Sequence, residues 1–230
     1  WAGARVDRHQ SQFGASLDLD GDWLAVGEPF LTIEGARWAG AVHLFHFDPD
    51  AQVWELAQTL VSPDPVSDSR LGSSVAMDGE TLAVAAPYER LGDISYAGAV
   101  YVFRLSGGVW KPDGKLRSPE PSGDAFGSAI DVSGDRVIVG APASSGRVFV
   151  FRRRTMVWNL AYEITPPIVP AWYHFGRSVA AIEGGWIVGG LEGPGSTGAL
   201  FVVDDPPAPS GPGAVIRSPH GDDWSFASTI

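Results

Sequence analysis

A short acidic segment offers the clearest metal-binding chemistry in this sequence. Asp18, Asp20 and Asp22 place three carboxylates around Gly21. Because hard cations such as Ca²⁺ bind several oxygen ligands at once, these three aspartates form a candidate calcium site. The chain returns to an apolar run at Trp23, however, and leaves no later carboxylate in the loop to act as a further ligand. A hairpin turn with solvated acids is the preferred interpretation, so no cofactor is expected, and calcium is the alternative.

The serine and histidine residues give little support for catalysis. Gly-x-Ser occurs in phase at 14–16, 72–74 and 176–178, and in no copy does the glycine follow that would complete a nucleophile elbow. His43 and His46 stand three residues apart, so on a strand they point to opposite faces and cannot share a metal. We therefore predict that the protein is not an enzyme.

Five aromatic residues fall outside the regular pattern of the chain and are candidate ligand-binding residues. Trp38 and Tyr96 lie in corresponding loops of the first two units. Trp172 and Tyr173 lie just before the Phe-Gly pair of the fourth unit, and Trp224 lies near the same place in the fifth. Loops on a rigid scaffold commonly carry recognition, and exposed Trp or Tyr beside carboxylates suits a protein contact or sugar stacking. Capping of the sheet ends is the structural alternative. Trp38 and Tyr96 are expected to share one patch on neighbouring units.

The elements that position these residues come from a repeated pattern. Each copy reads Phe-Gly-x-Ser, then a Gly-centred turn, then an apolar run closing on Gly-x-Pro, and then Gly-Ala-Val with alternating aromatics. The copies begin at Phe13, Leu71, Phe126, Phe175 and Phe226, and the fifth is cut short. A period in this range indicates a repeat architecture, in which each unit is one supersecondary element.

Each unit is predicted to form four short antiparallel strands. The apolar runs are rich in Val, Ile, Leu and aromatics, and Asp-Gly or Gly-Asp pairs between them indicate tight hairpins. The second strand, as at 82–85, is apolar on both faces and should be buried, whereas the fourth, around 55–61, should be the outer one. Four-stranded sheets repeated about an axis make a β-propeller. Trp54, Trp110 and Trp158 recur in register and should pack between the sheets.

These residues resemble the FG-GAP repeat of the integrin α-subunit propeller and its bacterial extracellular relatives. Phe-Gly at 13–14 pairs with Gly-Glu-Pro at 27–29, and Phe-Gly at 126–127 pairs with Gly-Ala-Pro at 140–142. The Gly-Ala-Val-Tyr-Val-Phe segment at 98–103 and Trp110 match the bacterial form. The resemblance covers nearly the whole chain and implies an all-β propeller that in this family usually has seven blades.

The chain is expected to be a single propeller region over 1–230, with about four blades and a partial fifth. Both ends fall within a blade, and three explanations stay open. The sequence is an excerpt of a longer chain, which we favour, or it closes as a small ring, or its open edges pair with strands of another subunit.

Composition fits a soluble extracellular β-protein. The net charge is −11, which argues against nucleic acid as a partner. The sequence has no cysteine and no apolar run long enough for a membrane span, so neither disulfides nor membrane insertion is expected.

These features predict a non-enzymatic adhesion or scaffold module on the cell surface or outside the cell, binding proteins through its loops. One alternative is a lectin-like propeller that binds glycans through rim aromatics. Another is a structural subunit of a fibre or sheath, with strands shared between neighbouring copies.

Overall fold

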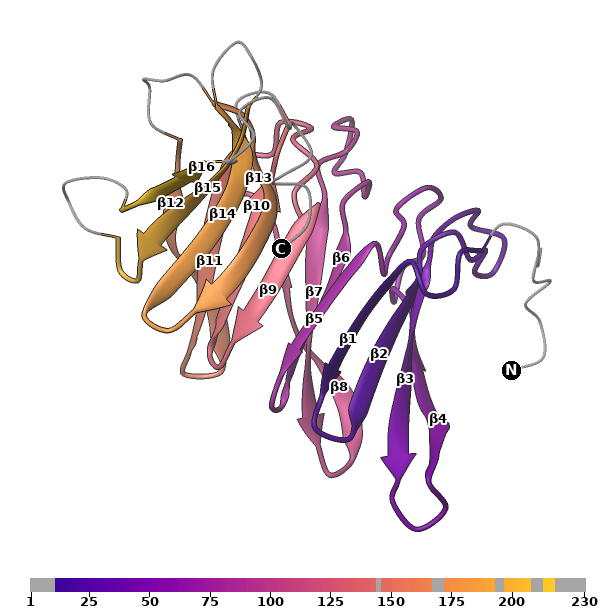
Figure 1. Ribbon diagram of the computed structural model, residues 1–230. Coiled ribbons are helices and arrows are strands. Elements are labelled where there is room, and N and C mark those ends of the chain that lie inside the picture. The colour runs from indigo at the N-terminus through magenta and orange to yellow at the C-terminus, as the bar shows by residue number, and fades with distance from the viewer. Residues whose placement is uncertain (1–10, 144–145, 167–171, 193–196, 208–212, 218–230) are drawn as a thin grey trace.

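The chain folds entirely into β-strands, turns and loops where the structure is described. The computed structural model describes residues 11–143, 146–166, 172–192, 197–207 and 213–217. Their sixteen strands form four separate four-stranded antiparallel sheets, each built from consecutive strands. The sheets stand side by side like blades (Figure 1). Among these residues there is no helix long and apolar enough to cross a membrane.

The four blades follow the sequence repeats. The first two contain β1 Ser16–Asp20, β2 Trp23–Glu28, β3 Ala41–Asp48, β4 Val53–Leu60, β5 Ser74–Asp78, β6 Thr81–Ala86, β7 Ala99–Ser106 and β8 Val109–Leu116. The third and fourth contain β9 Ala129–Ser133, β10 Arg136–Ala141, β11 Arg147–Arg154, β12 Val157–Ile164, β13 Trp172–Ile182, β14 Gly185–Glu192, β15 Thr197–Asp204 and β16 Val215–Arg217. The predicted all-β fold of four-stranded antiparallel blades is therefore confirmed. The fifth copy, at Phe226, lies outside the described residues.

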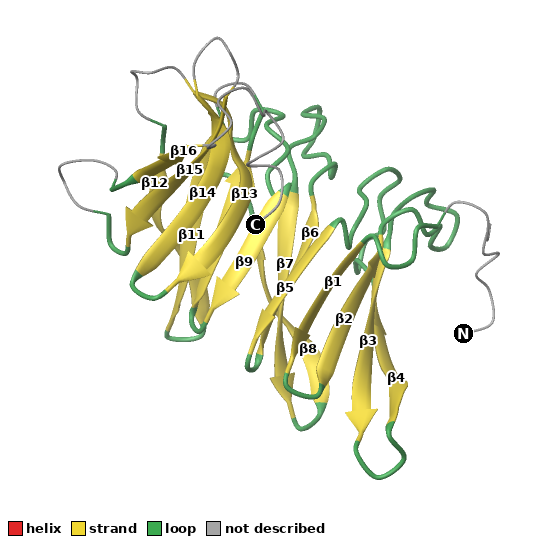
Figure 2. Cartoon of the chain, in the orientation of Figure 1, coloured by secondary structure: helices red, strands yellow, loops and turns green. Residues whose placement is uncertain are grey.

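Tight hairpins join the first and second strands of each blade at one end, and in the first two blades longer loops join the second and third strands at the other end (Figure 2). Gly21, Gly79 and Gly134 take φ values of 58°, 57° and 59° in the turns between the first and second strands. Such left-handed values suit a two-residue hairpin turn and favour glycine. The hairpins predicted from the Asp-Gly and Gly-Asp pairs are thus present, and the second-to-third-strand loops gather at the opposite end.

Burial falls from the middle of each blade to its outer strand. Every residue of β6 is buried, as its uninterrupted apolar sequence predicts, because this strand has a neighbouring strand on each edge and a blade on each face. By contrast, β4 is the last strand of its sheet and most of its residues are exposed. Both predictions about strand position are confirmed.

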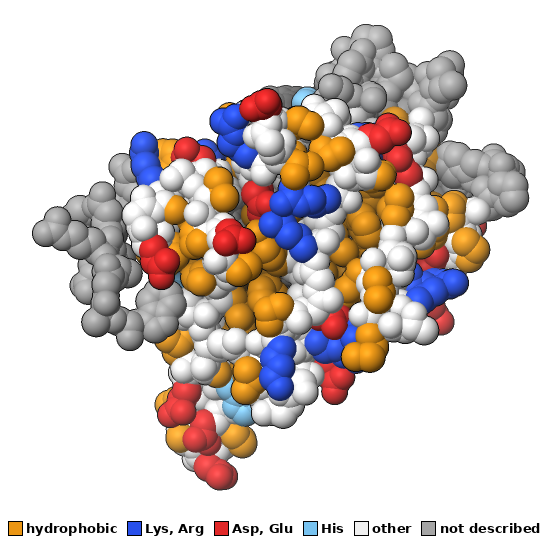
Figure 3. Space-filling model, turned by 180° about the vertical axis from the view of Figure 1, so that it is seen from behind, with side chains coloured by type: hydrophobic (Ala, Val, Ile, Leu, Met, Phe, Trp, Pro, Cys, Tyr) orange, Lys and Arg blue, Asp and Glu red, His pale blue; other side chains and the backbone are white. Residues whose placement is uncertain are grey.

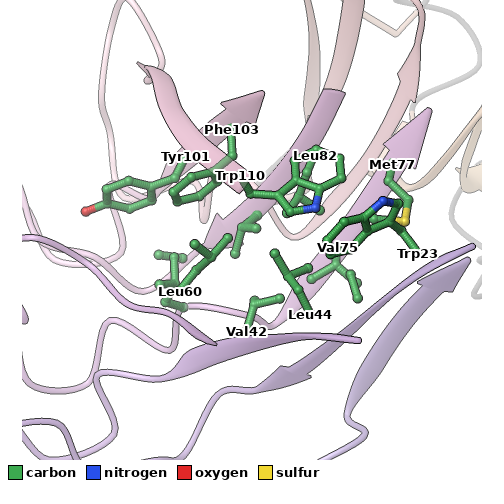
Figure 4. Close-up of a cluster of buried hydrophobic side chains, with 14 of the residues drawn as sticks. Trp23, Val42, Leu44, Leu60, Val75, Met77, Leu82, Tyr101, Phe103 and Trp110 are labelled. Atoms are coloured by element: carbon green, nitrogen blue, oxygen red, sulfur yellow. The ribbon is translucent and has the colours of Figure 1, made fainter. Parts of the chain in front are cut away.

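The apolar core lies between successive blades. One cluster joins Trp23 and Leu44 of the first blade to Val75, Leu82 and Trp110 of the second (Figure 4). Two further clusters join the second blade to the third and the third to the fourth. Each blade therefore buries at least one face against a neighbouring blade, which is the packing expected of a repeat architecture.

Backbone contact between blades explains the glycine that opens each Gly-Ala-Val segment. Gly98 has φ +72° and forms a parallel bridge with Phe126, the first residue of the next repeat. A Cβ added at Gly98 would lie 2.0 Å from the Phe126 carbonyl oxygen. Gly40 and Gly146 make the same approach to Leu71 and Phe175. A side chain at these positions would push two blades apart.

Trp54 corrects the prediction that all three in-register tryptophans are packed between blades. Trp110 is 1% exposed and Trp158 packs against a core cluster, but Trp54 is 41% exposed. It lies on the first blade, where Phe13 and Leu17 are also exposed although their counterparts in the second blade are buried. Among the described residues no blade covers this face. The repeat therefore places a tryptophan at this position in each of the three blades, but the side chain is buried only where a neighbouring blade covers it.

Candidate functional site

The candidate site lies at the loop end of the first two blades. It comprises side chains from the loops that join β2 to β3 and β6 to β7 and from the segment that joins β4 to β5. We call this set the aromatic–arginine rim; its members are Phe30, Arg37, Trp38, Arg70, Tyr88 and Tyr96.

Two aromatic pairs form the rim. The rings of Phe30 and Trp38 lie 5.4 Å apart at 78°, and those of Tyr88 and Tyr96 lie 5.4 Å apart at 77°. Edge-to-face geometry of this kind is favourable for aromatic rings and fixes their orientation. The same pair thus recurs on adjacent blades, which places Trp38 and Tyr96 on one rim.

Arg70 connects the two pairs. Its guanidinium carbon lies 4.8 Å from the ring centre of Phe30, 5.7 Å from that of Trp38 and 4.0 Å from that of Tyr88. A second guanidinium, that of Arg37, lies 3.7 Å from the ring centre of Trp38. A guanidinium over an aromatic face is attracted by the ring quadrupole. The sequence-based prediction identified Trp38 and Tyr96 but missed Phe30, Tyr88 and both arginines.

The backbone of the two rim loops has a structural role as well. Trp38 and Tyr96 have φ values of 53° and 56°, a region that bulky residues seldom adopt. Their carbonyl oxygens accept hydrogen bonds from the N–H groups of Arg70 at 3.0 Å and Ala125 at 2.9 Å, each directly before the first residue of the next repeat. The backbone therefore joins the blade ends, while the side chains stay outside the core: Tyr96 is 53% exposed and Trp38 is half-buried.

A buried carboxylate anchors the loop that carries Tyr88. Glu89 is 4% exposed; it accepts a hydrogen bond from the Tyr101 hydroxyl at 2.7 Å and pairs with Lys115 at 2.8 Å and with Arg117. Burial raises the pKa of Tyr101 above its usual value. A paired, hydrogen-bonded carboxylate at this depth holds the adjacent backbone in place.

The other aromatic candidates are not brought into this rim by the described residues. Trp172 and Tyr173 begin β13, where they pair with Glu192 and Leu191 of β14. Trp224 lies outside the described part of the chain. Ligand binding by these three residues stays a prediction.

The three aspartates of the candidate calcium site bind protein groups. Asp18 accepts a hydrogen bond from the Met77 amide at 2.7 Å, and Asp20 accepts one from the Gly79 amide at 2.6 Å. Asp22 lies 2.9 Å from Nε2 of His46. Within the described ranges there is no group of three or more histidine or acidic side chains arranged to hold a metal ion.

Carboxylates on the inner strands connect each pair of neighbouring blades in this way. Asp78 accepts a hydrogen bond from the Gly134 amide at 2.6 Å, and Asp131 accepts one from the Ala181 amide, also at 2.6 Å. Burial raises the pKa of the Asp131 carboxyl. Aspartates of the first strands therefore form inter-blade contacts, whose backbone partners stand some fifty to sixty positions later in the sequence.

Replacing Asp20 with alanine tests this structural role directly. The Gly79 amide loses its partner, so we expect the free energy of unfolding to fall by about 1 kcal/mol. The fall should be the same with calcium and with a chelator in urea unfolding experiments. A loss seen only when calcium is present would instead assign Asp20 to a metal site.

A hollow of about 720 Å³ lies at the opposite, hairpin end, between the second and third blades. Its lining includes Asp113, which accepts two hydrogen bonds from Arg153 at 2.8 and 2.9 Å and one from Trp158 at 2.8 Å. The hydrogen bond from Arg153 holds the pKa of the Asp113 carboxyl below its usual value. These polar groups already satisfy one another, which marks them as inter-blade contacts.

Charge is spread unevenly over the surface. In the view from behind, acidic side chains gather at the lower tip of the molecule, while basic side chains stand among apolar ones elsewhere on the same face (Figure 3). The net charge of −11 therefore does not prevent a locally basic and apolar site such as the rim.

The segment that carries Arg70 and the Tyr88–Tyr96 pair of the rim matches a known family. A family model described as the FG-GAP repeat matches residues 54–103. The chain contains an FG-GAP repeat. This match runs from the outer strand β4 through β7, so the FG-GAP unit spans the junction of the first two blades. Integrin alpha-PS5 of Drosophila melanogaster is 42% identical over 84 residues, which cover 32% of this chain and 8% of that protein.

Solved structures share the fold at low sequence identity. A Bacteroides uniformis protein, provisionally assigned as a 6-phosphogluconolactonase, has a TM-score of 0.55 at 13% identity, covering 89% of this chain and 55% of that one. A Lactobacillus plantarum protein gives 0.55 at 16%, covering 89% and 54%. Sqt1 of Saccharomyces cerevisiae gives 0.51 at 11%, covering 86% and 46%. The chain spans about half the length of these structures and a small part of the integrin.

The first of these structures corrects the prediction that the chain is not an enzyme. That prediction rested on the in-phase repetition of Gly-x-Ser and on the separation of the histidines. A structure of the same architecture is assigned as an enzyme, so repeated blades do not exclude catalysis. In this chain the Ser16 hydroxyl donates to the Gly72 carbonyl oxygen at 2.8 Å, across the first two blades.

Proposed function

We propose that this FG-GAP propeller region is a protein-binding module whose aromatic–arginine rim contacts the partner. The FG-GAP repeat and the similarity to an integrin α-chain support a role in protein contact and a position at the cell surface or outside the cell. The rim stands on the loop end, where a rigid blade scaffold presents variable side chains.

The observation that carries the proposal is the composition and geometry of the rim. Tryptophan, tyrosine and arginine dominate the energetically important positions of protein interfaces. Here they are fixed relative to one another on two blades, and Tyr96 remains 53% exposed. Leu91 and Ile94, in the same loop as Tyr96, are 37% and 36% exposed and add apolar surface. Such a surface loses little side-chain entropy when a partner binds.

The test compares rim variants with a matched variant at the hairpin end. Trp38→Ala and Tyr96→Ala should weaken binding to a partner selected from a panel of extracellular proteins by about tenfold or more. Met156→Ala, which removes a 77% exposed side chain next to the β11–β12 hairpin, should leave binding unchanged. Surface plasmon resonance on the immobilised chain measures all three.

The outcome also separates the protein-binding proposal from glycan binding. The Trp38→Ala and Tyr96→Ala variants are also tested on a glycan array. If they lose binding to a glycan but bind every protein of the panel as the wild type does, the ligand of the rim is a sugar and not a protein. Equal binding by all three variants would show that the rim is not the site.

A further inference from the structure

Arg70 differs from the arginines that pair with acidic groups elsewhere in the molecule. Arg104, Arg117, Arg136, Arg147, Arg152 and Arg153 each lie within ion-pair distance of a carboxylate. Within the described residues, Arg70 has no such partner, and its Nε is buried without a hydrogen-bond acceptor. Among the side chains that the structure describes, those that meet its charge are the aromatic faces of Phe30, Trp38 and Tyr88.

This environment leaves one part of the guanidinium open to a ligand. The ring centres of Phe30 and Tyr88 lie 4.8 and 4.0 Å from its central carbon and its Nε is buried, whereas neither terminal nitrogen is both buried and unpaired. Two parallel N–H groups at the end of a planar fork match the two oxygens of a carboxylate. Because the aromatic rings have already removed part of the hydration of the cation, a bound anion is attracted more strongly than in open water.

The backbone holds Arg70 in place without requiring an arginine. Its φ is 54°, its N–H donates to the Trp38 carbonyl, and its own carbonyl accepts a hydrogen bond from the Ser73 hydroxyl at 2.7 Å. The corresponding positions in the other repeats are Gln12, Ala125 and His174, with φ values of 54°, 56° and 52°. The repeat therefore dictates this backbone shape, and the guanidinium is specific to the junction of the first two blades.

We propose that Arg70 is a carboxylate receptor, and that the rim binds an acidic protein segment in which Asp or Glu stands beside an aromatic or aliphatic residue. This rests on the proposed function and adds the chemistry of the partner. Glu34 and Asp93 are exposed acidic residues in the same loops. Their negative charges repel an acidic ligand, so electrostatic attraction to Arg70 alone is not enough to bind it. The partner must therefore add apolar contacts with Tyr96, Leu91 and Ile94 to its single ion pair.

The test uses two synthetic peptides and arginine side-chain NMR. The probes are Ac-Glu-Phe-Glu-Phe-Glu-amide and the same peptide with Gln in place of Glu. The Glu peptide should shift the ¹H–¹⁵N signal of Arg70 Nε–H, assigned from its loss in Arg70→Lys, and should bind about tenfold more tightly than the Gln peptide. Arg70→Gln should bind the Glu peptide about tenfold more weakly, and Arg70→Lys should recover only part of this loss.

Arg104→Gln is the control, since Arg104 already pairs with Glu80 at the hairpin end, and its binding should match the wild type. Equal affinity for the two peptides, or unchanged binding in Arg70→Gln, would overturn the receptor proposal. So would an Arg70 shift caused by a glucuronate disaccharide and not by the Glu peptide. If Trp38→Ala loses partner binding while Arg70→Gln keeps it, the rim function stands and the carboxylate receptor is wrong. If neither variant changes binding, both proposals fail.

Discussion

Gly98→Ala is expected to lower the free energy of unfolding by roughly 3–5 kcal/mol. This loss is the sum of two costs: the strain of a left-handed backbone conformation in a residue that has a side chain, and overpacking between two blades. The new Cβ would lie 2.0 Å from the Phe126 carbonyl oxygen and 2.8 Å from two other backbone atoms of that residue. Backbone atoms cannot rotate away as a flexible side chain can, so the second and third blades must separate. A loss of this size is a large part of the stability of an ordinary domain.

Gly107→Ala is the matched control for this prediction. Gly107 has φ +62°, close to the +72° of Gly98, but a Cβ there would meet no atom within 4 Å. Its substitution should therefore cost only the backbone strain, roughly 1–2 kcal/mol. Urea unfolding of both variants measures the difference. Equal losses would mean that successive repeats do not touch through their backbones.

Asp205→Asn is expected to cost about 3 kcal/mol because it removes a buried carboxylate that pairs with two half-buried arginines. The Asp205 side chain is 1% exposed, pairs with Arg136 and Arg152, and accepts a hydrogen bond from Tyr162. These partners belong to the third blade, whereas Asp205 directly follows β15 of the fourth. Asp135→Asn is the control, since Asp135 lies near the same two arginines but is 59% exposed, and it should change stability by less than about 1 kcal/mol.

The pH dependence of the Asp205 contribution follows from the direction of its pKa shift. Burial alone would raise the pKa of this carboxyl, but hydrogen bonds from Tyr162 and Arg136 hold it below the usual value. Since the folded-state pKa is lower than the unfolded one, about 3.9, the stabilisation is complete above that pH and is lost as the pH falls through the folded-state pKa. The stability gap between wild type and Asp205→Asn should therefore shrink below about pH 4. A constant gap across this range would contradict the ion-pair explanation.

The repeat made the blades predictable because local residue chemistry determines them. Asp-Gly turns such as Asp78-Gly79 specify hairpins, and an apolar run such as 81–86 specifies a strand buried on both faces. Once the repeats are aligned with one another, the order of the four strands in each sheet can be predicted. Trp54 shows the limit of this reasoning, since its exposure depends on whether a blade covers it.

The rim was predictable only in part. Trp38 and Tyr96 depart from the repeat, which identified them, but Arg70 occupies a regular position and gave no such signal. Phe30 and Tyr88 carried one overlooked clue, because both directly follow the repeat proline where the third unit has Ala143. The hydrogen-bond partners of Asp18 and Asp20 were not predictable, since they are backbone amides at the first strand of the next blade and any residue type can supply them.

The most direct test of the account measures stability and partner binding for Tyr96→Ala on the same sample. Residues at regular repeat positions pack between blades, and we propose that the rim side chains that depart from the repeat bind the partner. For Tyr96→Ala we therefore expect a fall of about 1 kcal/mol or less in the free energy of unfolding, with partner binding weakened by about tenfold or more. A variant that unfolds several kcal/mol more easily while its binding is retained would show that Tyr96 serves the fold, and would contradict the account.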